Sequence, residues 1–252
     1  MDINAYLTRI NYHGSLMPNV QTLHELQLAH LLAVPFENLS IHAGEPIILT
    51  DESLFDKVVR RERGGFCYEL NGLFASLLRT LGFPVTMLSC RVATAEGDFS
   101  PDFDHMALMV SLDQRWLVDV GFGDTFREPL AIDDTDIQTQ FGRAYRIVAE
   151  DAHYIMMEHK DDGTWKAEYR FHLQPYQYAD YADMCHYHQT SPESHFTQRR
   201  ICSRATPEGR VTLSEMRFIT TTLSGERQER ELTSEAEYTT MLQKHFDIVM
   251  SR

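Results

Sequence analysis

The hydrophobic pattern of the chain changes from a helical to a strand period near residue 83, and this change limits the folds open to it. Before residue 83, apolar residues recur at intervals of three and four residues, which predicts helices. Capping residues, Gly and Pro mark the ends of these segments. The predicted helices are "MDINAYLTRINY", "TLHELQLAHLLAV", "DESLFDKVVRRERGG" and "CYELNGLFASLLRTLG".

After residue 83, short β-branched or apolar runs follow one another, separated by turn-like segments. The runs are "PVTMLSCRVAT", "HMALMVSL", "RWLVDVGF", "AYRIVAE", "HYIMMEHK" and "WKAEYRFH", with "KDDGT" as a hairpin turn between the last two. Strands in succession without helices between them favour an antiparallel barrel or sandwich. From about residue 176 the pattern is mixed: a helix in "YADYADMCHYHQ", strands in "VTLSEM" and "RFITTTLS", and a last helix in "TSEAEYTTMLQKHFDIV".

Charge and composition exclude several classes of protein. The chain has 252 residues, of which 43% are hydrophobic, so it can bury a sizeable core. The net charge of −14 argues against nucleic acid as a partner, because nucleic-acid binders carry a basic surface. No apolar run approaches the roughly 18 residues of a membrane span, and the N-terminus does not resemble a signal peptide. The four cysteines lack metal-ligand spacing and are too few for a disulfide scaffold. We therefore expect a cytoplasmic protein without a metal and without a membrane partner.

Cys67 stands in a setting that favours reactivity, in "ERGGFCYELNGLF" (residues 62–74). Two glycines precede it, and a predicted helix begins at it. A helix N-terminus lowers the pKa of a thiol, and glycine lets other molecules approach the backbone. This pattern predicts a nucleophilic cysteine.

A base for Cys67 and a partner for that base are predicted by two polar residues within apolar runs. His105 begins "HMALMV", and Asp119 interrupts "RWLVDVGFG", where an unpaired buried carboxylate would be costly. A hairpin turn centred on Leu112 would place these two residues directly opposite each other, and a turn centred one residue later would leave them within diagonal reach. We predict that Asp119 orients the His105 imidazole while its other nitrogen faces Cys67.

Each of these residues has a structural alternative. A cysteine at a helix start can serve packing, a buried His–Asp contact can be a core hydrogen bond, and an aspartate after "WLV" can end a strand. These alternatives would require all three residues to break the local pattern by coincidence, whereas one catalytic site explains all three. We therefore retain the catalytic interpretation.

At these residues the sequence resembles the arylamine N-acetyltransferases. The resemblance rests on "RGGFCYELN" (Arg63–Asn71), "VPFENLS" (Val34–Ser40), the histidine of "DHMALMV", "VDVGFG" (Val118–Gly123) and "SPESHFTQ" (Ser191–Gln198), all in family order. It implies an α+β fold in three parts: an N-terminal helical bundle (residues 1–82), a central antiparallel β-barrel (83–190) and a small C-terminal α/β lid (191–252). It also implies a Cys67–His105–Asp119 triad.

The resemblance further implies an enzyme of xenobiotic metabolism that moves an acetyl group from acetyl-CoA to an arylamine, arylhydrazine or arylhydroxylamine. The reaction would pass through acetyl-Cys67 by a ping-pong mechanism in a monomer or dimer. Phe36 and Phe122 would line the acceptor pocket, and Asp104 and Gly123 would contact CoA. Asp104 stands where the resemblance leads us to expect a small or hydroxyl-bearing residue near the thiol arm of CoA. The lid is also short, so the resemblance does not locate the site of the CoA nucleotide. The candidate basic partners for CoA, chosen because they cluster in the sequence, are Arg199, Arg200, Arg204 and Arg210, and a solvated face is an equal alternative for them.

Three other functions stay open from the sequence. A hydrolase or transglutaminase-like enzyme would share the triad, and a related amide synthase would close a macrolactam on a carrier-bound chain. A non-enzymatic module could bind metal through "MCHYHQ", although Cys185, His186 and His188 are too close in sequence for an ordinary tetrahedral site.

Two further charged residues near Cys67 are predicted to be structural. Arg63 precedes the glycine pair, and Glu37 stands in "PFENL". The turn at Gly64 and Gly65 should direct the guanidinium away from the sulfur. We expect a buried Arg63–Glu37 pair that holds this turn and so positions Cys67.

Overall fold

The computed structural model describes residues 1–249, and its first third is helical as the periodicity predicts. Asp2 and Asn19 cap the first two helices by accepting hydrogen bonds from the N–H groups of Ala5 and Thr22. The helical elements are α1 (Ile3–Arg9), α2 (Val20–Ala33), α3 (Leu39–His42), α4 (Asp51–Phe55), η1 (Asp56–Arg60) and α5 (Cys67–Thr80). The predicted helix from Asp51 departs from a uniform α-helix, because its second half, η1, is a π-helix.

An eight-stranded antiparallel sheet follows and curls into a nearly closed barrel. Its strands are β2 (Val85–Val92), β3 (His105–Ser111), β4 (Arg115–Val118), β5 (Leu130–Ala131), β6 (Gln138–Gln140), β7 (Arg143–Glu150), β8 (His153–His159) and β9 (Trp165–Phe171). They lie in the order β5-β4-β3-β2-β9-β8-β7-β6. The Gln138 side chain joins the two outer strands by bonding the backbone N–H and C=O of Ala131. The fold is therefore α+β with a barrel, as expected.

Strand β3 is buried on both faces, which explains its unbroken apolar sequence. Met106, Leu108 and Val110 pack in the same core as the helices. Ala107 and Met109, on the opposite face, pack inside the barrel. Because side chains alternate along a strand, His105 shares the inner face with Ala107 and Met109.

The C-terminal region forms a second antiparallel sheet. Its strands are β10 (Ile201–Thr206), β11 (Gly209–Ser214), β12 (Arg217–Thr222) and β13 (Arg227–Glu231), and α8 (Glu235–Phe246) packs in its core. The fifth strand, β1 (Phe36–Glu37), comes from the helical region and pairs with β10. Residues 250–252 of the expected lid lie outside the described residues.

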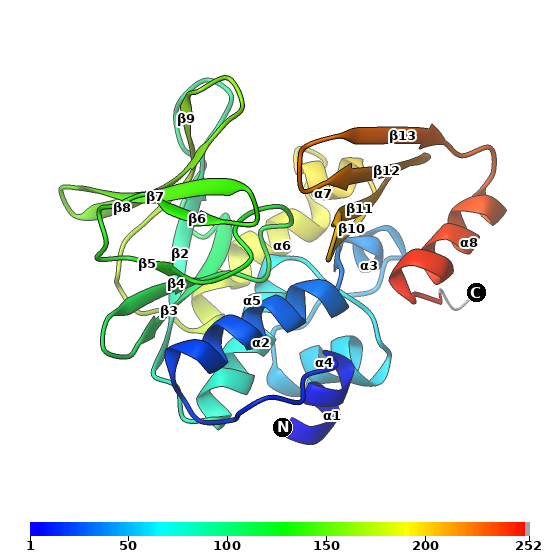
Figure 1. Cartoon of the computed structure of the whole chain (residues 1–252). Coiled ribbons are helices and arrows are strands. Elements are labelled where there is room, and N and C mark those ends of the chain that lie inside the picture. Colours follow the sequence, from blue (N-terminus) through cyan, green and yellow to red (C-terminus); the bar gives the residue numbers. More distant parts are fainter. Residues whose placement is uncertain (250–252) are drawn as a thin grey trace.

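Between the barrel and the lid lie η2 (Tyr178–Tyr181), α6 (Ala182–Thr190) and α7 (His195–Gln198). Tyr181, Cys185 and Phe196 from this segment are buried in the helical core. In Figure 1 the barrel lies on the left, the lid sheet and α8 on the right, and α6 runs between them near α5.

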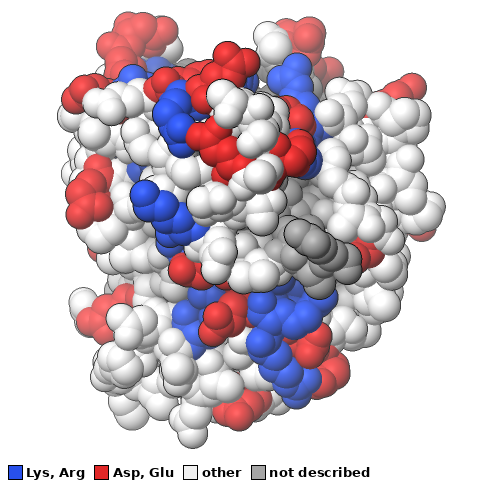
Figure 2. Space-filling model, turned by 90° about the vertical axis from the view of Figure 1, so that its right-hand side faces the viewer, with Lys and Arg blue, Asp and Glu red and all other residues white. Residues whose placement is uncertain are grey.

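Acidic and basic side chains intermingle on the lid side of the molecule, where groups of basic side chains have acidic ones beside them (Figure 2). Within residues 1–249, no helix combines the length and apolar character required to cross a bilayer.

Candidate active site

Cys67 is the first residue of α5 and is 3% exposed. The helix start is fixed by Glu69, whose carboxylate accepts a hydrogen bond of 3.1 Å from the Phe66 N–H. The same carboxylate receives one of 2.7 Å from the Lys57 ammonium. A buried charge pair thus determines where the backbone of Cys67 lies.

The chain itself approaches the glycines around Cys67. A Cβ added at Gly64 would lie 1.9 Å from the Pro35 carbonyl oxygen, and one added at Gly121 would lie 2.7 Å from the Cys67 Cα. Both contacts are too short for any side chain. The expectation that the glycine pair opens the site to other molecules is therefore wrong for Gly64: this glycine is needed for packing on residues 35–37.

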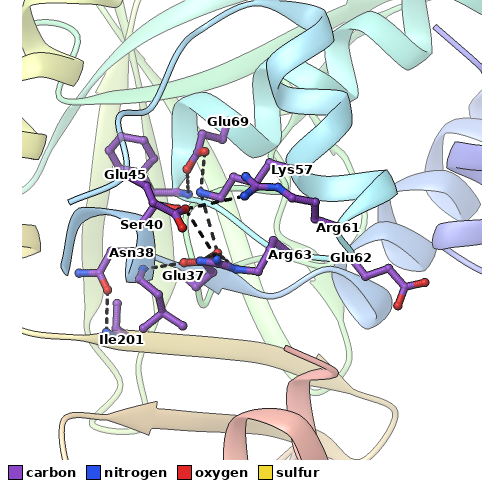
Figure 3. A network of polar contacts seen from close by, with 12 residues as sticks. Glu37, Asn38, Ser40, Glu45, Lys57, Arg61, Glu62, Arg63, Glu69 and Ile201 are labelled. Atoms are coloured by element: carbon purple, nitrogen blue, oxygen red, sulfur yellow. Dashed lines mark hydrogen bonds and ion pairs between the residues drawn. The ribbon is translucent and has the colours of Figure 1, made fainter. Parts of the chain in front are cut away.

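The predicted Arg63–Glu37 pair is confirmed (Figure 3). Nε and Nη2 of Arg63 lie 3.1 and 2.9 Å from Oε1 of Glu37, and both side chains are buried. The Lys57 ammonium lies 3.9 Å from the same oxygen, and the Leu39 N–H donates to the other oxygen at 2.6 Å. Burial disfavours ionisation of Glu37, but Lys57 and Arg63 hold its pKa below the ordinary value. The network joins the segment before α5 to β1 of the lid sheet.

His105 and Asp119 are in direct contact, with 2.7 Å between Nε2 and Oδ2. Of the two registers considered, the later one is present: Leu108 pairs with Val118, so the turn is centred on Asp113 and the two residues meet diagonally. Both lie on the inner face of the barrel wall. Nδ1 is the ring nitrogen that Asp119 leaves available.

Asp119 is fully buried and has four hydrogen-bond donors. Oδ1 accepts from Asn71 Nδ2 at 2.9 Å and from the Gly121 N–H at 2.8 Å, and Oδ2 accepts from Tyr169 at 3.2 Å in addition to His105. Both carboxylate oxygens of this buried residue are therefore hydrogen-bonded.

Asn71 and Tyr169 belong to the site but are not among the residues that the sequence patterns predicted. Asn71 lies one turn after Cys67 on α5 and also donates to the Met106 carbonyl at 2.6 Å and accepts from the Val120 N–H at 2.9 Å. It therefore joins the helix of Cys67 to the strand of His105 and the loop of Asp119. Its spacing of four residues from Cys67 was the available signal, since such residues share a helix face. No sequence signal pointed to Tyr169, because only closure of the barrel brings its strand, β9, to this site.

The thiol environment differs from the prediction. Burial raises the pKa of the Cys67 thiol well above its ordinary value, a hydrogen bond with the Met106 backbone lowers it, and the charges of Asp104 and Asp119 raise it further. The expected lowering by the helix N-terminus is therefore outweighed. The contact with Met106 places the sulfur beside the residue that follows His105. The role of His105 as the base for Cys67 stays a prediction.

Phe36, Phe122 and Gly123 line one pocket of about 300 Å³, which strands β10–β13 of the lid complete. The Phe122 ring meets the His105 ring edge-on, with 5.0 Å between centroids. Phe36 lies 6.2 Å from Phe196 between ring centroids. Asp124, Arg210 and Arg227 also line this pocket, which contacts the His105 ring through Phe122.

Asp104 contacts a histidine of α6. Its Oδ1 lies 3.1 Å from Nε2 of His188, and Nδ1 of His188 lies 3.0 Å from the Ser194 hydroxyl. Burial opposes ionisation of Asp104, and the hydrogen bond with His188 lowers the pKa of the carboxyl. A role in CoA binding stays a prediction for Asp104, as for Gly123.

Of the four clustered arginines, Arg210 lines the aromatic pocket. Arg200 pairs with Glu235 and Arg204 with Asp247; both carboxylates are exposed and both arginines are half-buried. The described residues contain no cluster of three or more His, Cys, Asp or Glu side chains arranged to hold a metal. In "MCHYHQ", Cys185 and His188 are buried, and His188 is engaged with Asp104 and Ser194.

Comparison with known proteins identifies the family. A family model described as N-acetyltransferase matches residues 19–252. The chain is 32% identical to the proansamycin X synthase of Amycolatopsis mediterranei, with 96% of each chain covered. The chain belongs to the arylamine N-acetyltransferase family.

Solved structures agree with this assignment. The arylamine N-acetyltransferase from Salmonella typhimurium superposes with a TM-score of 0.93 at 30% identity, over 99% of this chain and 92% of that one. The Mycobacterium marinum enzyme in complex with CoA superposes with a TM-score of 0.91 at 30% identity, over 98% and 93%. Membership in this family supports acetyl transfer from acetyl-CoA as the activity of this chain.

Proposed function

We propose that this protein transfers the acetyl group of acetyl-CoA to the nitrogen of an arylamine, arylhydrazine or arylhydroxylamine through an acetyl-Cys67 intermediate. The observation that carries the proposal is the buried His105–Asp119 contact next to a cysteine at the start of α5. The rings of Phe36 and Phe122 in the pocket support an acceptor with a flat aromatic ring.

In the first half-reaction, the Cys67 thiol gives its proton to Nδ1 of His105, and Asp119 stabilises the resulting imidazolium. The thiolate attacks the thioester carbonyl, and the new carbon–sulfur bond replaces the bond to CoA. N–H groups at the N-terminus of α5, including that of Cys67, are the proposed donors to the oxyanion. The CoA thiolate leaves with the proton held by His105.

In the second half-reaction, the amine attacks the acetyl-Cys67 carbonyl and gives its proton to His105. The carbon–sulfur bond breaks, and Cys67 returns as the thiolate–imidazolium pair. Burial raises the pKa of the Cys67 thiol, so the proposed thiolate depends on the charge of the imidazolium that accepts its proton.

The test is to mix the enzyme with acetyl-CoA alone and determine the mass of the protein. A gain of one acetyl group on Cys67, discharged by an arylamine, is expected, together with parallel double-reciprocal plots. Discharge by water alone would indicate a hydrolase. Discharge only by a protein amine or a carrier-bound chain would favour a transglutaminase-like enzyme or an amide synthase.

A further inference from the structure

The residues immediately before His105 form a turn with an unusual backbone conformation. Phe103 has a φ of 65°, in the left-handed region that an aromatic residue rarely adopts. Such a conformation persists only where the surrounding structure holds it, and it is frequent at functional sites. The contacts that hold Phe103 therefore also place His105, which begins β3 two residues later.

Two contacts from outside the helical region hold this turn. The Phe103 N–H donates to the Ser89 hydroxyl of β2 at 2.8 Å. The Phe103 ring meets the rings of Tyr176 and Tyr181 edge-on, with 4.9 and 5.3 Å between ring centroids. These contacts come from the barrel and from the segment that follows it.

Tyr68 supplies a third contact from α5, where it directly follows Cys67. Its hydroxyl donates to the Phe103 carbonyl at 2.6 Å, and the Asp104 carbonyl lies 3.2 Å from the same oxygen. The side chain is fully buried, and burial raises the pKa of the hydroxyl well above its ordinary value. The hydroxyl therefore stays a protonated donor at neutral pH.

Two side chains of α5 thus hold the backbone on either side of His105. Tyr68 reaches the carbonyls of the two residues before it, and Nδ2 of Asn71 lies 2.6 Å from the carbonyl of Met106, the residue after it. Tyr68 and Asn71 are three positions apart and share one face of the helix. The backbone of His105 is therefore bonded on both sides to the helix that begins at Cys67.

We propose that Tyr68 is a positioning residue: its hydroxyl fixes the turn before β3 and so sets the distance between the His105 imidazole and the Cys67 sulfur. The inference rests on the proposed function, because it takes His105 as the base for Cys67. Proton transfer requires that the two groups come within hydrogen-bond reach, and a small displacement slows the reaction strongly. Asp119 orients the imidazole, whereas Tyr68 determines where the backbone of that residue lies.

Replacing Tyr68 by phenylalanine removes the hydroxyl but no charge and no ring. The groups whose charges act on the Cys67 thiol are Asp104, Asp119 and Cys185, and Asp104 itself lies 3.1 Å from the imidazole of His188. All of these groups stay in Tyr68→Phe. A change in the titration of the thiol would therefore report a change in geometry.

The first experiment measures amide hydrogen exchange of Phe103 in the full chain by NMR, which needs no acetyl transfer. Tyr68→Phe should speed this exchange about tenfold, the scale of one lost hydrogen bond. Tyr12→Phe is the matched control, because the Tyr12 side chain is also buried and its hydroxyl donates to a backbone carbonyl, that of Ser15 at 2.8 Å. The control should leave exchange at Phe103 unchanged. Equal exchange in Tyr68→Phe and the wild type would overturn the proposal.

The second experiment follows alkylation of Cys67 by iodoacetamide as a function of pH, together with single-turnover acetylation. In Tyr68→Phe the midpoint of thiolate formation should rise by about one pH unit, because the imidazolium lies farther from the sulfur. The maximal acetylation rate should fall about tenfold, without a change in the acetyl-CoA concentration that gives half of this rate. A role in packing alone would lower the Tm and leave the titration and the rate as in the wild type, and this result would overturn the proposal.

A second variant decides the outcome if Tyr68→Phe does not fold. Ser89→Ala removes the hydroxyl that accepts the Phe103 N–H, so it should shift the titration of Cys67 in the same direction. An unchanged titration in folded Ser89→Ala would overturn the role of the turn. Absence of acetyl-Cys67 in the wild type would instead overturn the proposed function, and hydrogen exchange at Phe103 would still decide whether Tyr68 holds the turn.

Discussion

Replacing Arg63 by methionine tests whether the buried ion pair with Glu37 supports the start of α5. Glu37 is fully buried and would keep only the Leu39 N–H at 2.6 Å and the Lys57 ammonium at 3.9 Å. Removing one partner of a buried pair costs about 3–5 kcal/mol. Because the Lys57 ammonium stays near Glu37 as a positive charge, we expect the free energy of unfolding to fall by about 3 kcal/mol, the lower of these figures. The Tm of a chain of this length should then fall by roughly 6–12 °C.

Thermal unfolding followed by circular dichroism measures this loss, and Arg60→Met is the matched control. Arg60 also contacts a carboxylate, that of Glu52 at 2.6 Å, but the two side chains are 53% and 77% exposed. Such exposed pairs contribute at most about 1 kcal/mol. The control should therefore lower Tm by no more than roughly 4 °C.

The rate of alkylation of Cys67 as a function of pH separates a structural role from an electrostatic one. In the folded fraction of Arg63→Met, the thiol should titrate as in the wild type, because the guanidinium bonds Glu37. Equal Tm losses in Arg63→Met and Arg60→Met would refute the argument. So would an unchanged Tm with a raised pKa of the Cys67 thiol, which would make Arg63 a charge partner of the nucleophile.

Three further predictions concern the same region. Cys67→Ser should keep its Tm, but mass spectrometry should detect no acetyl-enzyme, because a serine hydroxyl does not hold a comparable anion at neutral pH. In the wild type, acetyl-CoA should protect Cys67 from alkylation by iodoacetamide. Asp119→Asn should slow single-turnover acetylation on the order of 10³–10⁴-fold, because it removes the charge that stabilises the imidazolium. If the variant keeps most of the wild-type rate, the assignment of Asp119 is wrong. The depressed pKa of Glu37 adds stability that is present above its unfolded value of 4.5 and is lost as the pH falls through the folded value. Acid titration of unfolding should therefore show a smaller loss of stability below pH 4.5 in the double variant Glu37→Gln, Arg63→Met than in the wild type.

Local sequence patterns were sufficient to predict most of the regular structure. The helical period located α1, α2, α4 and α5, and alternation of apolar residues with turn signals located most strands of the barrel. Strand β13 gave no such signal, because all five of its residues are exposed and polar. Strand β1 was missed because two residues carry no period.

The sequence by itself also marked the unusual residues of the candidate site. Several residues conflict with the local pattern of the sequence: Cys67 follows two glycines, His105 and Asp119 stand within apolar runs, and Arg63 and Glu37 carry charges. A polar group in a buried segment needs a partner, so each conflict predicted a contact. Two of these contacts, His105 with Asp119 and Arg63 with Glu37, are present.

Only the tertiary structure decided how these residues meet. A turn centred on Asp113 made the His105–Asp119 contact diagonal, and closure of the barrel brought Tyr169 to the same carboxylate. Burial raised the pKa of the Cys67 thiol, which helix position alone would lower. Arg127 and Arg210 lie 83 residues apart in the chain and line one cleft because the lid packs on the barrel. Such register, burial and long-range charge balance depend on distances between elements, and no local period of the sequence encodes them.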